Sequence, residues 1–312
     1  MIGSRIRALG HYQPATLLTN DDIAKRVDTN DAWIRSRVGI RTRHVAQADE
    51  SVTDMATQAA AKALAKAGLA PADIDFVVVA TCTALERTPS VASRVAARLG
   101  IPSPAALDVN AACSGFPHAL GLANLAIGGG SATAALVIGA EKLTEFTDWS
   151  DRTTCVLVGD GAGAAVVVAS PTPEISPVFW GSAPDLGRAV LIEGREGRFT
   201  QDGLTVYKWA TATVPEIARR VCEVAGVRAQ ELGGVVLHQA NLRIIEPVVR
   251  EIGAVDAVIA RDVVESGNTS AASIPLAFSK LVERGELESG TPVLLVGFGG
   301  GLSYAGQVVR CP

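Results

Sequence analysis

The amino-acid sequence contains an internal repeat, and this repeat limits the possible folds more than any other feature. When 158 is added to a residue number in the first half, similar residues often fall together. Around residues 100 and 253 the offset slips to 153 and then recovers. The matching segments are 63–68 with 221–226, 74–79 with 232–237, Asn110 with Asn268, Pro117 with Pro275, and 136–139 with 294–297. The chain is therefore predicted to contain two related halves, residues 1–170 and 171–312, with a junction near Pro171, Pro173 and Pro177.

Both halves predict the same order of helices and strands. The strands are continuous apolar runs, which indicates α/β sheets covered by helices on both faces. The third helix of each half should begin near a shared centre. Residues 153–170 predict a hairpin with its bend at 159–163, and residues 303–310 predict a last strand. The expected elements, in pairs, are helices 53–67 and 212–225, strands 75–81 and 233–238, helices 89–98 and 244–252, helices 114–127 and 271–284, and strands 134–139 and 292–297.

Composition excludes several classes of protein. Hydrophobic residues make up 48% of the chain and charged residues 19%, which is typical of a packed globular protein. A net charge of −4 gives no reason to expect nucleic acid binding. The apolar runs are too short to span a membrane, and the N-terminus lacks the apolar core of a signal peptide. Five scattered cysteines without a CxxC pair predict neither a disulfide framework nor a metal site. We therefore expect a protein of the reducing cytoplasm.

Cys113 is the first candidate catalytic residue. It lies in the stretch 108–117, where a strand is expected to turn into a helix. Unpaired N–H groups and the positive end of the helix dipole would lower the pKa of its thiol and favour the nucleophilic thiolate. Small neighbours leave the sulfur approachable. The alternative is a buried cysteine with a packing role only.

His238 and Asn268 are the second and third candidates. His238 ends the first strand of the second half, and Asn268 is the counterpart of Asn110 in the Cys113 turn. Taken singly, His238 could be a structural histidine and Asn268 a helix cap. The loops after sheet strands are where α/β proteins place their chemistry, so all three at matched strand ends predict one site.

Three motifs resemble a known family. Residues 110–115, 238–245 and 267–273 resemble the active-site motifs of β-ketoacyl-acyl carrier protein synthase III, a condensing enzyme of the thiolase fold. The likeness extends over nearly the whole chain, through residues 31–41, 151–153, 159–163 and 298–301. It implies a thiolase-like fold whose two duplicated halves form α-β-α-β-α layers.

The resemblance also implies a reaction. Cys113 would take the acyl group of an acyl-coenzyme A as a thioester, and malonyl-acyl carrier protein (ACP) would then lose carbon dioxide and attack it. His238 and Asn268 would donate hydrogen bonds to the malonyl enolate, and the backbone N–H groups of Cys113 and Gly300 would form the oxyanion hole. This acyltransferase reaction starts fatty acid or polyketide synthesis. It needs no cofactor and no metal, because acyl-CoA and malonyl-ACP are its substrates.

Further residues match the substrate-binding positions of the family. Trp33 and Arg152 resemble the pair that sandwiches the adenine of coenzyme A, and Arg37 resembles the residue beside its phosphates. Gln239 and Arg243 match the acyl carrier protein site, an acidic partner. Each has a simpler alternative: a helix core residue for Trp33, surface charges for the arginines, and a loop hydrogen bond for Gln239. The family also implies a homodimer that pairs through its sheet.

Thr88 bears on the size of the acyl group. The segment 86–89 resembles the dimer-interface stretch that reaches into the acyl pocket of the neighbouring subunit. Some family members have a bulky phenylalanine at the position of Thr88, which restricts them to short straight primers. The smaller threonine predicts branched or longer primers here. Alternatively, Thr88 is an ordinary turn residue before Pro89.

Other functions remain open at this point. Starter-unit synthases of aromatic polyketide pathways share the fold and the three catalytic residue types, and an acyltransferase of a secondary-metabolite pathway is a further alternative. 3-Hydroxy-3-methylglutaryl-CoA synthases also share the fold and these residue types, but they use a glutamate base that cannot be placed in this sequence. A non-catalytic thiolase-fold binding protein is a different class, and the intact Cys113 argues against it.

Overall fold

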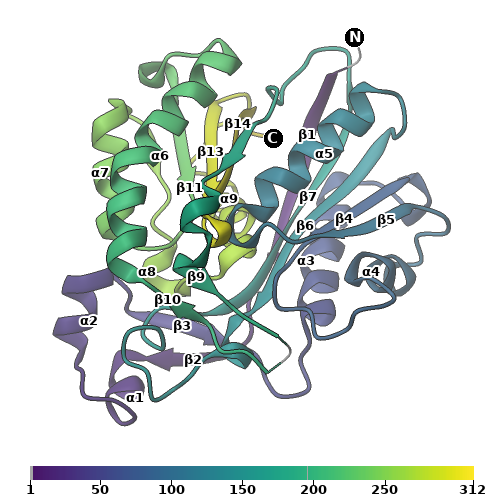
Figure 1. Ribbon diagram of the computed structural model, residues 1–312. Helices are drawn as coiled ribbons and strands as arrows, with labels where there is room; N and C mark the ends of the chain where they lie inside the picture. The colour runs from purple at the N-terminus through teal and green to yellow at the C-terminus, as the bar shows by residue number, and fades with distance from the viewer. Residues whose placement is uncertain (1–2, 195) are drawn as a thin grey trace.

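Five layers of helices and sheets form the body of the protein, as the computed structural model of residues 3–194 and 196–312 shows (Figure 1). One outer pair of helices packs against the first sheet, and the other outer pair packs against the second sheet. Two helices lie between the sheets. The layers are α3 (Val52–Ala67) with α4 (Val91–Leu99), the first sheet, α5 (Gly115–Gly128) with α9 (Ser273–Glu283), the second sheet, and α6 (Gly203–Ala225) with α7 (Leu242–Ile252).

The two sheets have the same topology. The first has the order β1 (Gly3–Tyr12), β7 (Asp160–Ser170), β6 (Ala134–Lys142), β4 (Phe76–Ala80) and β5 (Ala105–Val109). The second has the order β8 (Phe179–Ser182), β14 (Ser303–Arg310), β13 (Pro292–Phe298), β11 (Gly234–Leu237) and β12 (Val258–Ile259). In both, the last three strands are parallel and the first two pair antiparallel. The predicted duplication of an α/β unit is therefore confirmed.

Repeated local signals produce the repeated elements. Gly68 ends α3 and Gly226 ends α6, both with left-handed φ angles of 64° and 67°. Only glycine adopts this conformation without a Cβ penalty, so each helix stops at the same point of the repeat. The following strands β4 and β11 are buried along their whole length, as their apolar runs predicted.

The predicted hairpin at 153–170 is wrong, because its glycines lie inside a strand and allow close helix packing instead of forming a bend. β7 is one strand that starts at Asp160, and Gly161 and Gly163 lie inside it. A Cβ on Gly163 would come within 2.5 Å of the backbone nitrogen of Leu276 in α9. The glycine therefore lets a helix of the second half approach a strand of the first half closely.

One helix begins earlier than its sequence indicates. α6 starts at Gly203 and not near residue 212, because the Asp202 side chain accepts a hydrogen bond from the Thr205 backbone N–H and caps the helix. The division of the chain at residues 170 and 171 stays a prediction, since helices of both halves share the central layer.

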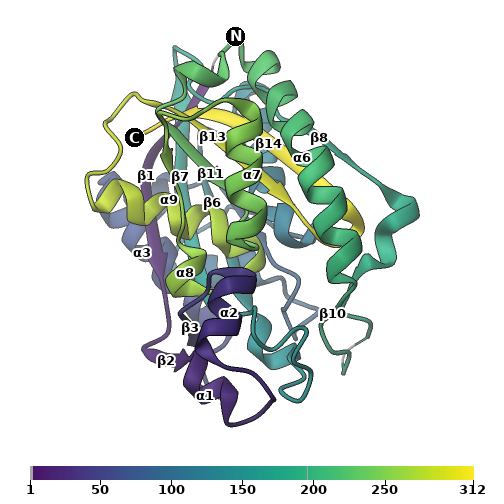
Figure 2. The same ribbon diagram turned by 90° about the vertical axis from the view of Figure 1, so that its left-hand side faces the viewer.

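A smaller extension lies beyond one end of the layers (Figures 1 and 2). Arg43 ties it to the body, because its buried guanidinium donates to Asn20 Oδ1 at 2.7 Å and to the Val156 carbonyl at 2.6 Å. In the part of the chain that the structure describes, no helix is long and apolar enough to cross a membrane. The extension consists of β2 (Thr16–Thr19), α1 (Asn20–Ala24), α2 (Asp31–Val38) and β3 (Thr42–Val45), and the short elements elsewhere are β9 (Val190–Leu191), β10 (Thr200–Gln201) and α8 (Val263–Ser266).

Candidate active site

Cys113 lies in a tight turn between β5 and α5. The turn is a single 3-10 helix over residues 112–114, and Ala112 in it has a left-handed φ of 45°. A non-glycine residue in this conformation is held there by its surroundings. Opposite the turn lies Gly299, where a Cβ would come within 2.8 Å of the Cys113 sulfur. The missing side chain of Gly299 thus leaves room for the thiol.

The second half repeats this turn. Ser270 follows Ala112 by 158 residues and is also left-handed, with a φ of 47°. Two residues earlier, the buried Asn268 accepts a hydrogen bond from the Ser270 N–H at its side-chain Oδ1, at 2.9 Å. This bond fixes the amide orientation and leaves the Asn268 NH₂ as the end that can donate to a ligand.

His238 follows β11 and is buried, with 2% of its surface exposed. Its Nδ1 lies 2.7 Å from Ser273 Oγ, and its ring packs edge-on against Phe298. Ser273 Oγ also accepts the Gln239 N–H, so its own proton is free to go to Nδ1. A Ser273 hydroxyl that donates to Nδ1 leaves the proton of a neutral imidazole on Nε2. Burial lowers the pKa of His238 to about 3, so the ring is neutral at physiological pH.

The expected thiolate of Cys113 is not what the structure supports. Cys113 precedes α5, and burial raises the pKa of its thiol to about 11, with a smaller contribution from the negative charge of Glu141. The backbone N–H groups of Gly300 and Cys113 act in the opposite direction, and so does the nearby Ser270 side chain, whose hydroxyl donates to Glu141. Desolvation of the charged form outweighs these contributions, so the thiol is favoured over the thiolate at neutral pH.

A cavity of about 550 Å³ connects the two turns. Cys113, Asn268 and Gly300 line it together, and His238 is not among the lining residues. Most of the remaining lining comes from the segment between β8 and α6, and single residues after β4 and β6 complete it. This part of the lining is mostly apolar. The lining includes Cys82, Leu143, Val190, Leu191, Ile192, Phe199 and Ser270.

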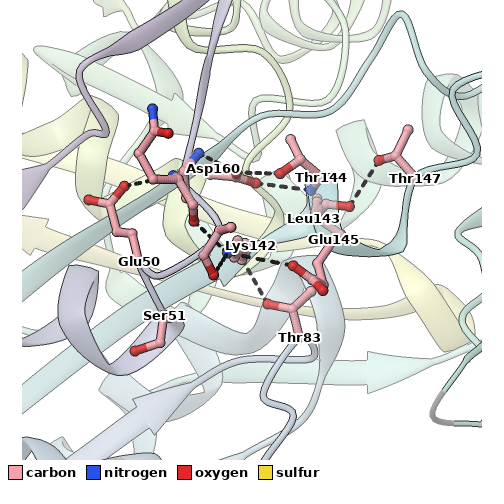
Figure 3. Close-up of polar contacts among 12 residues, drawn as sticks. Glu50, Ser51, Thr83, Lys142, Leu143, Thr144, Glu145, Thr147 and Asp160 are labelled. Carbon is pink, nitrogen blue, oxygen red and sulfur yellow. Dashed lines mark hydrogen bonds and ion pairs between the residues drawn. The ribbon is translucent and has the colours of Figure 1, made fainter.

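A buried polar network supports one wall of the cavity (Figure 3). Asp160 at the start of β7 accepts hydrogen bonds from the Thr144 hydroxyl at 2.5 Å, the Thr144 N–H at 3.0 Å and the Ala46 N–H at 2.8 Å. Burial raises the pKa of Asp160 to about 6, against these bonds. They fix the short helix over residues 143–146 and with it Leu143 in the cavity wall.

The predicted coenzyme A residues form a cluster on the surface. The guanidinium of Arg152 lies 5.1 Å from the centre of the Trp33 ring, and that of Arg37 lies 5.8 Å from it. Arg152 also donates to the Asp28 carbonyl at 2.9 Å. An aromatic face between two cations can stack a base and neutralise phosphates.

The two residues matched to the acyl carrier protein site lie in different environments. Arg243 is exposed in the first turn of α7, with its guanidinium 5.5 Å from the Tyr207 ring centre. Gln239 is 1% exposed, and its side chain bonds to Leu237, Ala260 and Val263. Gln239 is therefore placed to hold its loop together, and not to meet a docking protein.

Thr88 is exposed in the loop before α4 and does not line the cavity of its own chain. Sequence reasoning also missed Cys82, Glu141 and Ser270, which meet beside Cys113. The signal for Glu141 was a charged residue directly after the apolar run 136–140.

Among the described residues, no group of three or more His, Cys, Asp or Glu side chains could hold a metal ion.

The raised pKa of Cys113 makes a testable prediction. Its alkylation by iodoacetamide should accelerate about tenfold per pH unit from roughly pH 7 to pH 10, because only the thiolate reacts. Mass spectrometry of the Cys113 peptide measures the rate, and Cys113→Ala reports the background of the other cysteines. A rate that levels off below about pH 8 would show instead that the helix terminus governs this thiol.

The fold and the cavity define a condensing enzyme of the thiolase fold. Residues 107–184 match the model of the family described as 3-oxoacyl-[acyl-carrier-protein] synthase III, and residues 222–311 match its C-terminal model. The chain is 69% identical to β-ketoacyl-[acyl-carrier-protein] synthase III 2 of Streptomyces avermitilis, with 100% of both chains covered. It is 66% identical to synthase III 4 of Streptomyces coelicolor, with 99% of both covered.

Solved structures agree. The priming β-ketosynthase of the R1128 polyketide biosynthetic pathway superposes with a TM-score of 0.96 at 39% identity, over 99% of this chain and 96% of that one. The 3-oxoacyl-[acyl-carrier-protein] synthase III of Aquifex aeolicus gives 0.95 at 40% identity, over 99% and 100%. This chain belongs to the β-ketoacyl-acyl carrier protein synthase III family, and it is a condensing acyltransferase that acts at the start of fatty acid or polyketide synthesis.

Proposed function

We propose that Cys113 accepts the acyl group of an acyl-CoA and that malonyl-ACP then condenses with it to give a 3-oxoacyl-ACP. The observation that carries this proposal is the shared cavity, in which the Cys113 sulfur and the Asn268 amide line one space. Attack by the Cys113 sulfur on the acyl carbonyl forms a new C–S bond and breaks the one to coenzyme A, and the proton of the thiol leaves with coenzyme A as CoA–SH. Decarboxylation of the malonyl group then supplies the carbanion that forms the C–C bond and frees Cys113.

Asn268 and His238 stabilise the enolate in this proposal. Both would donate to the malonyl thioester oxygen, Asn268 through its NH₂ and His238 through Nε2–H. The neutral state of His238 suits a donor that need not lose a proton. The N–H groups of Cys113 and Gly300, two residues that line the cavity together, would stabilise the oxyanion on the acyl carbonyl.

Binding of the substrates follows the surface features. Trp33, Arg37 and Arg152 would hold the adenine and phosphates of coenzyme A. Arg243 would contact the acidic acyl carrier protein. No cofactor takes part in these steps. The five cysteines are all free, which supports a location in the cytoplasm.

We also propose a homodimer formed through the edge of the first sheet. β5 has an unpaired edge, and its apolar Leu107 is 39% exposed. Leu85 in the loop before α4 is 44% exposed. A largely apolar strand edge invites pairing with a second copy. The one charged residue of β5, Asp108, is already bonded to the N–H groups of Val91 and Ala92 at the start of α4. Pairing there would carry the loop with Thr88 toward the neighbouring subunit.

A primer assay tests the proposed function. Purified protein with malonyl-ACP should convert isobutyryl-CoA at a rate at least equal to that of acetyl-CoA, because Thr88 is small. Thr88→Phe should shift the preference toward acetyl-CoA by about 10–200-fold, the range for a change of pocket size. Competition kinetics with mass detection of the 3-oxoacyl-ACP measures both.

The control variant is Thr172→Phe, which adds the same ring at another exposed loop. It should leave the primer preference unchanged. A strong acetyl preference in the native protein that Thr88→Phe does not alter would overturn the role of Thr88. No product from any primer would overturn the condensing function.

A further inference from the structure

Glu141 is a buried carboxylate that the catalytic steps above do not use. It follows the apolar part of β6 and has 0% of its surface exposed. Burial raises the pKa of Glu141, whereas the surrounding hydrogen bonds lower it. All its contacts are donors, as an ionised carboxylate requires. They are the hydroxyls of Thr81 (3.1 Å), Thr83 (2.5 Å) and Ser270 (3.1 Å), the thiol of Cys82 (3.3 Å), and the N–H groups of Cys82 (3.1 Å) and Ala271 (3.4 Å).

These donors come from two loops in different halves of the chain. Residues 81–83 follow β4 of the first half, and residues 270–271 precede α9 of the second half. Cys82 and Ser270 both line the cavity beside Cys113. Glu141 therefore joins the two halves at the wall of the active site. Thr83 in turn accepts the Lys142 N–H at 2.9 Å, which links this wall to the network of Figure 3.

Glu141 stabilises a turn that would otherwise be unfavourable. A left-handed non-glycine residue such as Ser270 costs on the order of 1–3 kcal/mol. The carboxylate binds the Ser270 hydroxyl and the next N–H, of Ala271, at the same oxygen. The Ser270 N–H is thereby aimed at Asn268 Oδ1, at 2.9 Å. A continuous set of hydrogen bonds thus runs from Glu141 through Ser270 to the amide of Asn268.

The internal repeat shows the same position used in two ways. The counterpart of Glu141 in the second half, 158 residues later, is Gly299. Each closing strand faces the turn of the other half: β6 lies against Ala271, and β13 lies against Ser114. At the Cys113 turn this residue is Gly299, which has no side chain and so leaves space for the sulfur. At the Asn268 turn the equivalent residue is Glu141, which places a carboxylate beside the turn.

We propose that Glu141 is a positioning residue for condensation, which holds the Ser270 turn and so aims the Asn268 NH₂ at the malonyl thioester oxygen. This inference rests on the proposed donor role of Asn268. It assigns Glu141 no contact with either substrate, and it separates the two half-reactions. Loss of the carboxylate should impair decarboxylation and condensation, and should leave transfer of the acyl group to Cys113 nearly intact.

Glu141→Gln tests the proposal, because it keeps the size and turns one acceptor into a donor that faces other donors. Malonyl-ACP decarboxylation should fall about 10- to 100-fold, the cost of a displaced catalytic group. Acylation of Cys113, followed as the burst of coenzyme A release, should change by less than about threefold, as expected for a step that does not use Asn268. The matched control is Glu145→Gln, four residues along the chain at a half-exposed side chain, and it should retain both rates.

A double variant separates positioning from a general structural effect. In an Asn268→Ala background, Glu141→Gln should lower decarboxylation by less than about twofold further, since residues that act through one another are not additive. Losses that multiply would overturn the proposal, and so would equal losses of acylation and decarboxylation in the single variant. If Asn268→Ala alone has no effect, the proposed function of Asn268 fails, which is a different result.

Ser270→Ala gives an independent test if Glu141→Gln does not fold. It removes the hydroxyl between Glu141 and the turn, and it keeps the backbone N–H that holds Asn268. Decarboxylation should fall severalfold, and again not further in the Asn268→Ala background. An unchanged rate in Ser270→Ala would contradict the connection.

Discussion

Cys113→Ala is expected to abolish condensation, and His238→Ala or Asn268→Ala to lower it by about 10²–10³-fold, the cost of losing one donor to a developing negative charge. Without the sulfur there is no acyl-enzyme to attack. In the proposed mechanism His238 and Asn268 act on the malonyl oxygen and not on the acyl-CoA, so both alanine variants should still acylate Cys113. The loss should therefore fall on the second half-reaction alone.

Three measurements distinguish these outcomes. Mass spectrometry of the intact protein counts acyl groups on Cys113, carbon dioxide release follows decarboxylation, and 3-oxoacyl-ACP reports condensation. Cys222→Ala is a suitable control, because this cysteine is on the buried face of α6 and does not line the cavity. A near-normal condensation rate in His238→Ala would exclude His238 as an enolate donor.

The sequence could predict the fold because its repeat is expressed in local signals. Gly68 and Gly226 end equivalent helices, and the apolar runs at β4 and β11 form equivalent strands. Once two halves are expected, the position of Asn268 relative to Asn110 places it beside the Cys113 turn. The candidate site thus followed from the arrangement of strand ends, before any side-chain contact was known.

The features that could not be predicted depend on contacts between the halves. Gly163 resembles a turn residue in sequence, but α9 packs so closely that β7 needs a glycine there. The pKa of Cys113 depends on burial, which a local helix signal does not contain. Glu141 has no local pattern that reveals its partner Ser270, because 129 residues separate them.

Gly299→Ala is expected to inactivate the first half-reaction. Gly299 has a φ of 172°, an extended conformation that alanine adopts without strain. The new Cβ, however, would lie 2.5 Å from Cys113 Cβ and 2.8 Å from its sulfur. These contacts are far below van der Waals distance, so the nucleophile or the turn must move. A displacement of about 1 Å costs roughly 10²-fold in rate, and the loss of space for the acyl group adds to it.

The expected result is a loss of acylation by at least about 10²-fold with the fold retained. The burst of coenzyme A release measures acylation, and the unfolding temperature measures the fold. Gly203→Ala, at the start of α6, serves as the control, because a Cβ there meets nothing closer than the Gln201 side-chain nitrogen at 3.5 Å. Acylation at the native rate in Gly299→Ala would mean that the sulfur can leave its position without loss of reactivity. The absence of a side chain at Gly299, the counterpart of Glu141 in the repeat, would then not be required for Cys113 to act as a nucleophile.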